Sequence, residues 1–279
     1  MKKYLFVTCL ILFAAFAKAQ EDVIFKIKYL PNHTYQINGN NSVSFYTDLS
    51  AYKEIASRLA AQGISQPVNA YINYSSQGVV TTSKIATDKS FPVEMQFSTY
   101  PLTGYLNGKT IPIPTKKNIV KIYGNVSADG RINVDSLNSK KLTDSTAASA
   151  KTMMNKMMGM INFPEHPLKV GESFTQNLPF DFPMVKGMVI NIKITYKLIS
   201  VTDGKAYFDL TQGLDMNMNI KEVNINLLGS GIGKMVYDIK NNYPVSNSGD
   251  ISMTINIKSD KFTGAATAEV KSKINYIIN

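Results

Sequence analysis

Alternation of apolar and polar residues is the feature that most limits what this chain can fold into. Between Val189 and Val201 apolar side chains occupy nearly every second position, and Leu214–Ile220 and Ile251–Lys258 repeat the pattern. Because successive side chains of a strand point to opposite faces, each run has one apolar and one polar face. The pattern is typical of an antiparallel sheet that is packed on one side and solvated on the other.

Turn signals separate these runs. Ala128-Asp129-Gly130-Arg131 and Thr202-Asp203-Gly204-Lys205 each contain the Asp-Gly pair that favours a hairpin. The glycine-rich stretch Gly229–Lys234 has neither spacing of a phosphate-binding loop, so we interpret it as a bulged or bent strand. About a dozen strands with short connections are expected. They also include Val23–Tyr29, His33–Asn38, Ala70–Ser75, Val79–Ala86, Val93–Tyr100, Ile119–Val126, Gly233–Ile239 and Ala268–Ile278.

Two segments have helical spacing instead. Asp48–Gln62 places Leu49, Ile55 and Leu59 on one stripe, and Gly63 suits its end. Thr143–Ile161 carries Ala150 and a row of methionines at intervals of three and four. The fold class predicted is therefore mainly β (α+β): a large curved antiparallel sheet or partly open barrel, with both helices packed on its concave side.

The prolines between residues 163 and 183 suggest a boundary within this β-rich domain. We expect one domain over residues 20–279, with halves 20–141 and 163–279 joined by helix 143–161. A short internal echo supports the division, since Lys28–Tyr35 resembles Leu168–Phe174 in its order of extended arm, tight turn and aromatic residue.

The first nineteen residues predict export. Lys2 and Lys3 precede an apolar run over Tyr4–Phe16, and Ala17-Lys18-Ala19 is a small-x-small cleavage site, so residues 1–19 are interpreted as a signal peptide. The run is too short to span a bilayer stably. The single cysteine, Cys9, lies inside it, in a context unlike a lipid-anchoring site. We expect a protein of the periplasm, the cell surface or the extracellular space, without disulfide bonds.

Charge narrows the choice of partner. The chain has a formal charge of +10, but its basic residues are almost all lysines spread along alternating strands. Nucleic-acid binders usually gather arginines and aromatics in one stripe, so no nucleic-acid partner is expected. Weak attraction to an anionic membrane surface or a glycan stays open, as does the oligomeric state.

Methionines are the candidate functional residues. Five lie within Met153–Met160, and others follow on later strands. Three interpretations stay open: a helix that fills gaps in the core, a groove for a lipid or another apolar ligand, and a thioether site for Cu(I). For the groove, the predicted ligand-binding residues are Met153, Met157, Met158, Met216 and Met218.

No sequence context supports catalysis. The two histidines, His33 and His166, lie in turns rich in proline, and no nucleophile or paired carboxylate accompanies them. The acidic residues are scattered, so a hydrolase is disfavoured, and neither a metal site nor a cofactor is expected.

The chain resembles uncharacterised families of secreted bacterial β-rich proteins in three features. These are the signal peptide ending at Ala19, the segment Phe163-Pro164…Pro167–Phe174, and the long amphipathic strands after it. More distantly, a curved sheet with helices on its concave face resembles the periplasmic carriers of lipids and lipoproteins. This resemblance implies a non-enzymatic envelope protein that binds an apolar ligand, such as a lipid or a lipidated partner. The alternative is a structural or adhesive envelope protein whose polar strand faces are the working surface.

Overall fold

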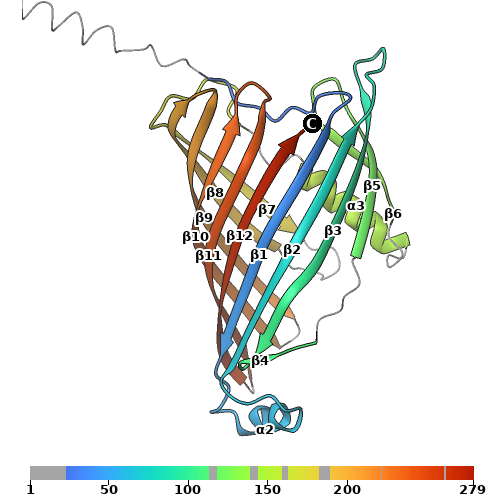
Figure 1. Ribbon diagram of the computed structural model, residues 1–279. Helices are drawn as coiled ribbons and strands as arrows, with labels where there is room; N and C mark the ends of the chain where they lie inside the picture. Colours follow the sequence, from blue (N-terminus) through green and yellow to red (C-terminus); the bar gives the residue numbers. More distant parts are fainter. Residues whose placement is uncertain are drawn as a thin grey trace, which may run out of the picture.

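A 12-stranded antiparallel sheet dominates the structure (Figure 1). The computed structural model describes residues 23–112, 118–138, 144–158, 163–181, 189–220, 222–260 and 262–279; the predicted signal peptide lies outside them. The strands are β1 (Thr34–Thr47), β2 (Val68–Thr82), β3 (Phe91–Leu106), β4 (Lys109–Thr110), β5 (Asn118–Val126), β6 (Ile132–Asn138), β7 (Ser173–Asp181), β8 (Val189–Thr202), β9 (Lys205–Ile220), β10 (Val223–Asp238), β11 (Tyr243–Ser259) and β12 (Phe262–Ile278).

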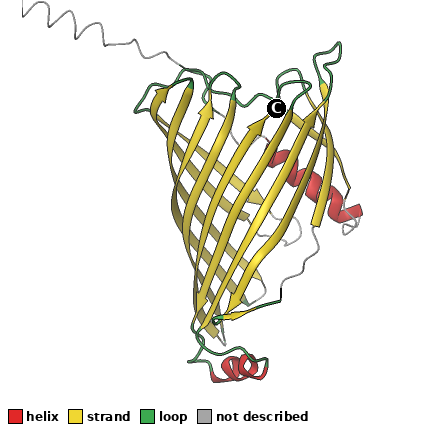
Figure 2. Cartoon of the chain, in the orientation of Figure 1, coloured by secondary structure: helices red, strands yellow, loops and turns green. Residues whose placement is uncertain are grey.

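The strands follow the order β6-β5-β3-β2-β1-β12-β11-β10-β9-β8-β7, and β4 pairs only with β3. The sheet curls into a funnel whose wide end holds the C-terminus (Figure 2). In this order β6 and β7 are the two outermost strands, so the funnel stays open between them. The first and last strands close the other side, because β1 pairs with β12 from Tyr35–Ile278 to Thr47–Ala266. A large, curved antiparallel sheet that is not closed into a barrel confirms the predicted fold class.

The two helices differ in their relation to the sheet. Helix α3 (Asp144–Met158) packs on β6, and its Met154 contacts core side chains on the inner face. Helix α2 (Lys53–Ala61) connects β1 to β2 beyond the narrow end, and none of its side chains is buried (Figure 1). Its predicted place on the concave side was wrong. Tyr52, just before the helix, makes an edge-on ring contact with Phe262 at the start of β12 and donates a hydrogen bond to the Thr263 carbonyl, which holds the segment beyond the strand ends.

Asn155 attaches α3 to the edge of the sheet. Its side-chain carbonyl accepts a hydrogen bond from the Val134 amide at 2.7 Å, and its Nδ2 donates to the Val134 carbonyl at 3.3 Å. Both main-chain groups of Val134 point away from β5, towards the open side of β6. On that side a further strand would pair in a larger sheet. The helix thus covers part of an edge that would otherwise present unpaired backbone groups.

Several strands are longer than their alternation indicated. The segment Ala70–Ser75 and the first part of Val79–Ala86 merge into β2, which ends at Thr82, so that residues 83–86 lie outside the strand. Residues 23–29 form only a bridge between Val23 and Leu168 instead of the predicted strand. Gly229–Lys234 is part of a strand, as expected, but of the two expected forms, bulged or bent, the bulge is absent, since β10 pairs regularly there with both neighbours.

Glycine is needed in β10 for close packing of backbones. A Cβ atom on Gly231 would lie 2.4 Å from the carbonyl oxygen of Asp250 on β11, and one on Gly233 would lie 2.3 Å from that of Ser248. Neither contact is sterically allowed. The glycines therefore let tightly curved neighbouring strands approach, without an extra residue in the ladder.

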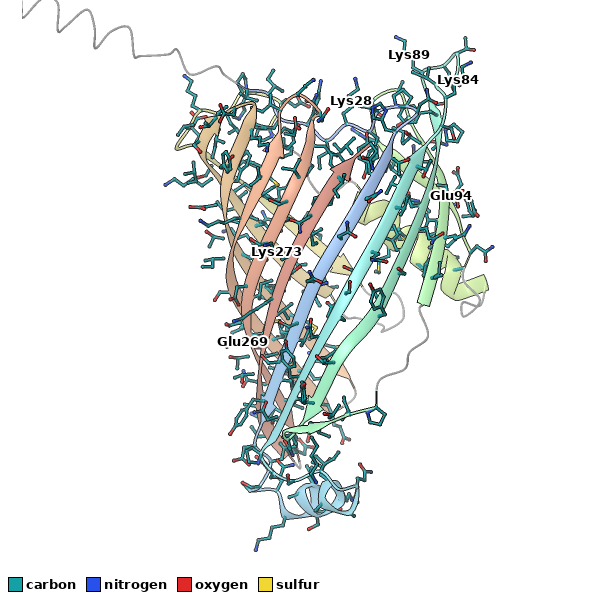
Figure 3. The ribbon with its side chains drawn as sticks, in the orientation of Figure 1. Lys28, Lys84, Lys89, Glu94, Glu269 and Lys273 are labelled. Carbon is teal, nitrogen blue, oxygen red and sulfur yellow. The ribbon has the colours of Figure 1, made fainter. Side chains whose placement is uncertain are left out.

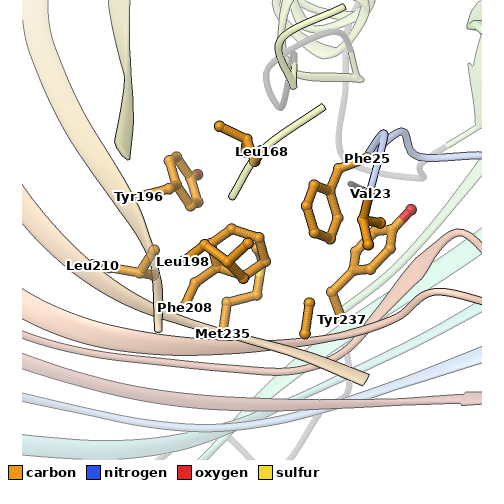
Figure 4. Close-up of a cluster of buried hydrophobic side chains, with 10 residues drawn as sticks. Val23, Phe25, Leu168, Tyr196, Leu198, Phe208, Leu210, Met235 and Tyr237 are labelled. Atoms are coloured by element: carbon orange, nitrogen blue, oxygen red, sulfur yellow. The ribbon is translucent and has the colours of Figure 1, made fainter. Parts of the chain in front are cut away.

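Two clusters of buried side chains fill the wide half of the funnel. The first lies under β8–β10 and includes Phe25, Tyr196, Leu198, Phe208 and Tyr237 (Figure 4). Phe25 comes from the N-terminal segment and makes edge-on ring contacts with Phe208 and Tyr237 at 5.1 and 5.2 Å. Ile27 and Tyr29 of the same segment pack on a second cluster, so residues 23–29, where a strand had been predicted, span both clusters.

The second cluster lies under β2, β3, β5 and β6. It is built from Tyr35, Val80, Phe91, Val93, Met95, Ile122, Val126, Ile132, Val134 and Tyr243. Tyr35 and Met95 are fully buried. Both clusters lie near the wide end, which leaves the inner face of the narrower half as a separate region.

Candidate functional site: the apolar inner wall

The inner face of the narrower half carries continuous apolar rows that cross several strands. We define the inner wall as these side chains on β8–β11: Ile190, Ile192, Leu214, Met216, Met218, Ile225, Leu227, Met253, Ile255 and Ile257. The register aligns Ile190 with Met216, Met216 with Leu227, and Leu227 with Ile255. A parallel row aligns Ile192 with Leu214. The wall is therefore one surface.

Small side chains continue the wall on β12. Ile255 is opposite Ala266, and Met253 is opposite Ala268. Beyond them, Ala268 is opposite Phe45 on β1. The alanines project little from the sheet, so this side of the interior is lined closer to the backbone than the side lined by β8 and β9.

Apart from Met216 and Met218, the wall residues are less buried than the residues of the two core clusters. Leu198 and Tyr35 in the clusters are 0% exposed, whereas Ile192, Leu227 and Ile255 are only half-buried. Met216 and Met218 are 5% and 7% exposed. Half-buried aliphatic side chains on a concave face retain apolar area that another apolar surface can cover.

The five predicted ligand-binding methionines divide into two groups. Met216 and Met218 lie in the wall on β9. Met153 lies on α3, half-buried, and it is the neighbouring Met154 that packs on the second core cluster. Met157 and Met158 belong to the last turn of α3, and their side chains lie outside the described set. Neither core cluster unites the α3 and β9 methionines, so their shared site stays a prediction.

Most of the remaining wall residues were missed as candidates because they are ordinary aliphatics, and Met253 was missed because it lies outside the methionine-rich helix and β9. Their signal was nevertheless present, since the alternation of Ile251–Lys258 already assigned Met253, Ile255 and Ile257 to one face. Which strands lie beside them was not readable locally, because Leu227 meets Ile255 only through the pairing of β10 with β11.

The outer face of the same strands is polar. Hollows of about 590 and 480 Å³ lie there and share Ser230, Ser252 and Glu269. The exposed apolar residues Leu228 and Ile232, at 56% and 70%, are separated by Ser230. The polar and apolar faces that the alternation predicted are thus the outer and inner faces of the funnel.

Buried tyrosines close the wide end. The hydroxyls of Tyr29 and Tyr243 are 3.1 Å apart, and the Tyr35 hydroxyl accepts a hydrogen bond from the Leu30 amide at 2.7 Å. Burial raises the pKa of Tyr29, Tyr35 and Tyr243, and it raises the pKa of Tyr276 to about 12. The hydrogen bonds of Tyr29 and Tyr35 tie the N-terminal segment to β11 and β1.

The histidines occupy turns, as expected. The Nδ1 atom of His33 lies 2.7 Å from the Pro31 carbonyl, and that of His166 lies 3.0 Å from the Pro167 carbonyl. Among the described residues, no group of three His, Cys, Asp or Glu side chains is placed to hold a metal ion. No helix in the described ranges has the length and apolar character needed to cross a membrane.

Comparison with known proteins gives only distant likenesses. No protein-family model matches the sequence, and a search of curated proteins gave no match. Among solved structures, lipovitellin, in a study of its lipid–protein interactions, aligns over 90% of this chain at 9% identity with a TM-score of 0.46. The chain spans only 26% of lipovitellin.

Two bacterial proteins align at lower scores. OccK7 (OpdD) of Pseudomonas aeruginosa has a TM-score of 0.27 at 5% identity, and the alignment covers 88% of this chain and 99% of OccK7. A bacterial polysaccharide outer membrane secretin has a TM-score of 0.30 at 8% identity, and the alignment covers 89% of this chain and 100% of the secretin. Such scores mean that the chain resembles these proteins in having a large β-sheet, and no functional argument follows from them.

Proposed function

We propose that this protein is a non-enzymatic cell-envelope carrier that holds an apolar ligand, a lipid or the lipid of a lipidated partner, against its inner wall. The observation that carries the proposal is the set of continuous apolar rows on β8–β11, in which the aliphatic side chains, such as Ile192, Leu227 and Ile255, are half-buried. A soluble domain gains free energy by covering such area, about 25 cal/mol per Å² removed from water. Met216 and Met218 suit ligands of varied shape because their side chains are flexible and polarisable.

The architecture supports this use of the wall. The two packed clusters and the segment 23–31 occupy the wide half, so that a ligand would lie in the narrower half. The outermost strands β6 and β7 are not paired with each other, so a ligand that entered between them would not have to break strand pairing, although α3 covers part of the β6 edge. In the competing hypothesis of a structural or adhesive protein, the polar outer face is the surface that binds partners, and no ligand covers the wall.

Adjacent leucines on β10 provide a matched test. Leu227 belongs to the inner wall, whereas Leu228 lies on the outer face and is 56% exposed. Leu227→Asn keeps side-chain size but places an amide on the wall, and an amide desolvated without a partner costs about 1–3 kcal/mol. We expect this variant to bind a fluorescent C16 fatty acid about ten-fold more weakly than the wild type.

Leu228→Asn is the control and should bind the probe like the wild type. Leu227→Met changes the same wall position without adding a polar group, and it should bind the probe like the wild type. Normal binding by this variant would show that Leu227→Asn loses affinity through its amide and not because any change at this position disturbs the fold. Native mass spectrometry of protein purified from the envelope then identifies the natural ligand. Equal probe affinity for Leu227→Asn and Leu228→Asn, together with a protein mass free of any ligand, would favour the structural or adhesive hypothesis.

A further inference from the structure

Basic and apolar side chains meet at a hollow on the wide end, away from the inner wall. The hollow measures about 380 Å³ and is lined by the N-terminal segment 26–31, the β2–β3 hairpin and the β5–β6 turn. Ile27, Leu30 and Phe91 contribute apolar surface to it, and Lys26, Lys28 and Lys89 surround it. Figure 3 places Lys28, Lys84 and Lys89 together at this end of the molecule.

The hairpin beside the hollow has an ordered tip. The Ala86 amide donates to the Ser90 carbonyl at 2.7 Å, and the Lys89 amide donates to the Ala86 carbonyl at 3.0 Å. At this tip Ile85 is 48% exposed, between the exposed Lys84 and Lys89. The β2–β3 hairpin reaches beyond the neighbouring strand ends (Figure 1), and Ile85 lines the hollow at its tip.

Positive charge predominates around this hollow. Lys26, Lys28, Lys84 and Lys89 are exposed, and none forms an ion pair with a carboxylate in the described part of the chain. The nearby carboxylates are already engaged by local groups.

Asp129 pairs with Arg131 at 3.2 Å, and Asp88 accepts hydrogen bonds from the Ser90 hydroxyl and amide. Hydrogen bonds from serine hydroxyls and main-chain amides lower the pKa of both aspartates, so they are ionised at neutral pH. Even with these two negative charges included, cations predominate, because Arg131 joins the four lysines.

We propose that the part of the wide end around this hollow, the basic rim formed by Lys26, Lys28, Lys84, Lys89 and Arg131, docks the protein on an anionic lipid membrane. Lysines near an anionic surface each contribute to binding, and a shallow apolar side chain such as Ile85 inserts among the headgroups. Ile24, 55% exposed on the segment that crosses the same end, adds a second apolar contact. The proposal extends the carrier function by stating which end meets the membrane, but it does not require that the inner wall binds a ligand.

Vesicle sedimentation with delipidated protein tests the rim. Vesicles of 30% phosphatidylglycerol in phosphatidylcholine should bind the wild type at low salt, whereas pure phosphatidylcholine should not. The variant Lys84→Gln/Lys89→Gln should partition about 30-fold more weakly, because two surface lysines are removed. Lys193→Gln/Lys273→Gln removes the same charge from outer strand faces and should bind more strongly than the rim variant.

Ile85→Ser should weaken binding without changing its salt dependence. Equal binding by the two lysine variants, or equal binding to neutral and anionic vesicles, would overturn the proposal. Binding to a soluble polyanion such as heparin without binding to vesicles would overturn it as well. The Leu227→Asn variant should still bind vesicles, so a failure of the rim and a failure of the inner wall are told apart.

Discussion

Phe25 tests whether the N-terminal segment holds the wide half together. Its side chain is 2% exposed and lies within ring-contact distance of Phe208, Tyr237 and Phe163. Truncating a buried phenylalanine costs about 3–5 kcal/mol, and edge-on aromatic pairs add to the loss. We therefore expect Phe25→Ala to lower the free energy of unfolding by about 4 kcal/mol, a large share of the roughly 5–15 kcal/mol typical of native proteins.

The neighbouring residue supplies the control. Ile24 is 55% exposed, so Ile24→Ala should change the free energy of unfolding by less than about 0.5 kcal/mol. Urea titrations followed by far-UV circular dichroism compare the two variants, and equal slopes confirm that the midpoints report stability. If Phe25→Ala unfolded at the same urea concentration as Ile24→Ala, residues 23–31 would not pack against the sheet in solution.

Two further predictions concern the sheet and its tyrosines. Gly231→Ala should destabilise the protein by about 1–3 kcal/mol, because its Cβ would meet the Asp250 carbonyl, whereas Gly213→Ala, with nothing within 4 Å, should be neutral or slightly stabilising in the same urea titration. The folded state raises the pKa of Tyr276 to about 12, above the value near 10 of an unfolded tyrosine. Its contribution to stability is therefore full below about pH 10 and lost as the pH rises towards 12. Thermal unfolding should show a smaller fall in Tm between pH 9 and 11 for Tyr276→Phe than for the wild type, and identical pH dependence would contradict the assignment.

Much of the sheet was predictable because alternation is a local property. The period of two in Val189–Val201 and Ile251–Lys258 identified β8 and β11 and assigned their inner faces correctly. It also implied the wall, since Met216 and Met253 lie on the apolar faces of their strands. It did not indicate that Leu227 is their neighbour.

The errors arose where local patterns have two readings. The apolar stripe of helix 53–61 suggested burial, but the contacts of Tyr52 with Phe262 and Thr263 hold that segment beyond the narrow end. The apolar residues 23–29 suggested a strand. The strand that follows them, β1, already pairs with β2 on one side and β12 on the other, so these residues cannot pair with it, and Phe25 packs in the first core cluster instead.

The sequence alone determined that this chain forms long amphipathic antiparallel strands, because the period of side chains along a strand is set by its covalent geometry. Only the tertiary structure decided that β1 pairs with β12 and that β6 and β7 are left as the outermost strands. These pairings join residues more than two hundred positions apart, such as Tyr35 and Ile278. Their stability depends on how the whole curved sheet buries its inner face, which no local stretch of sequence encodes.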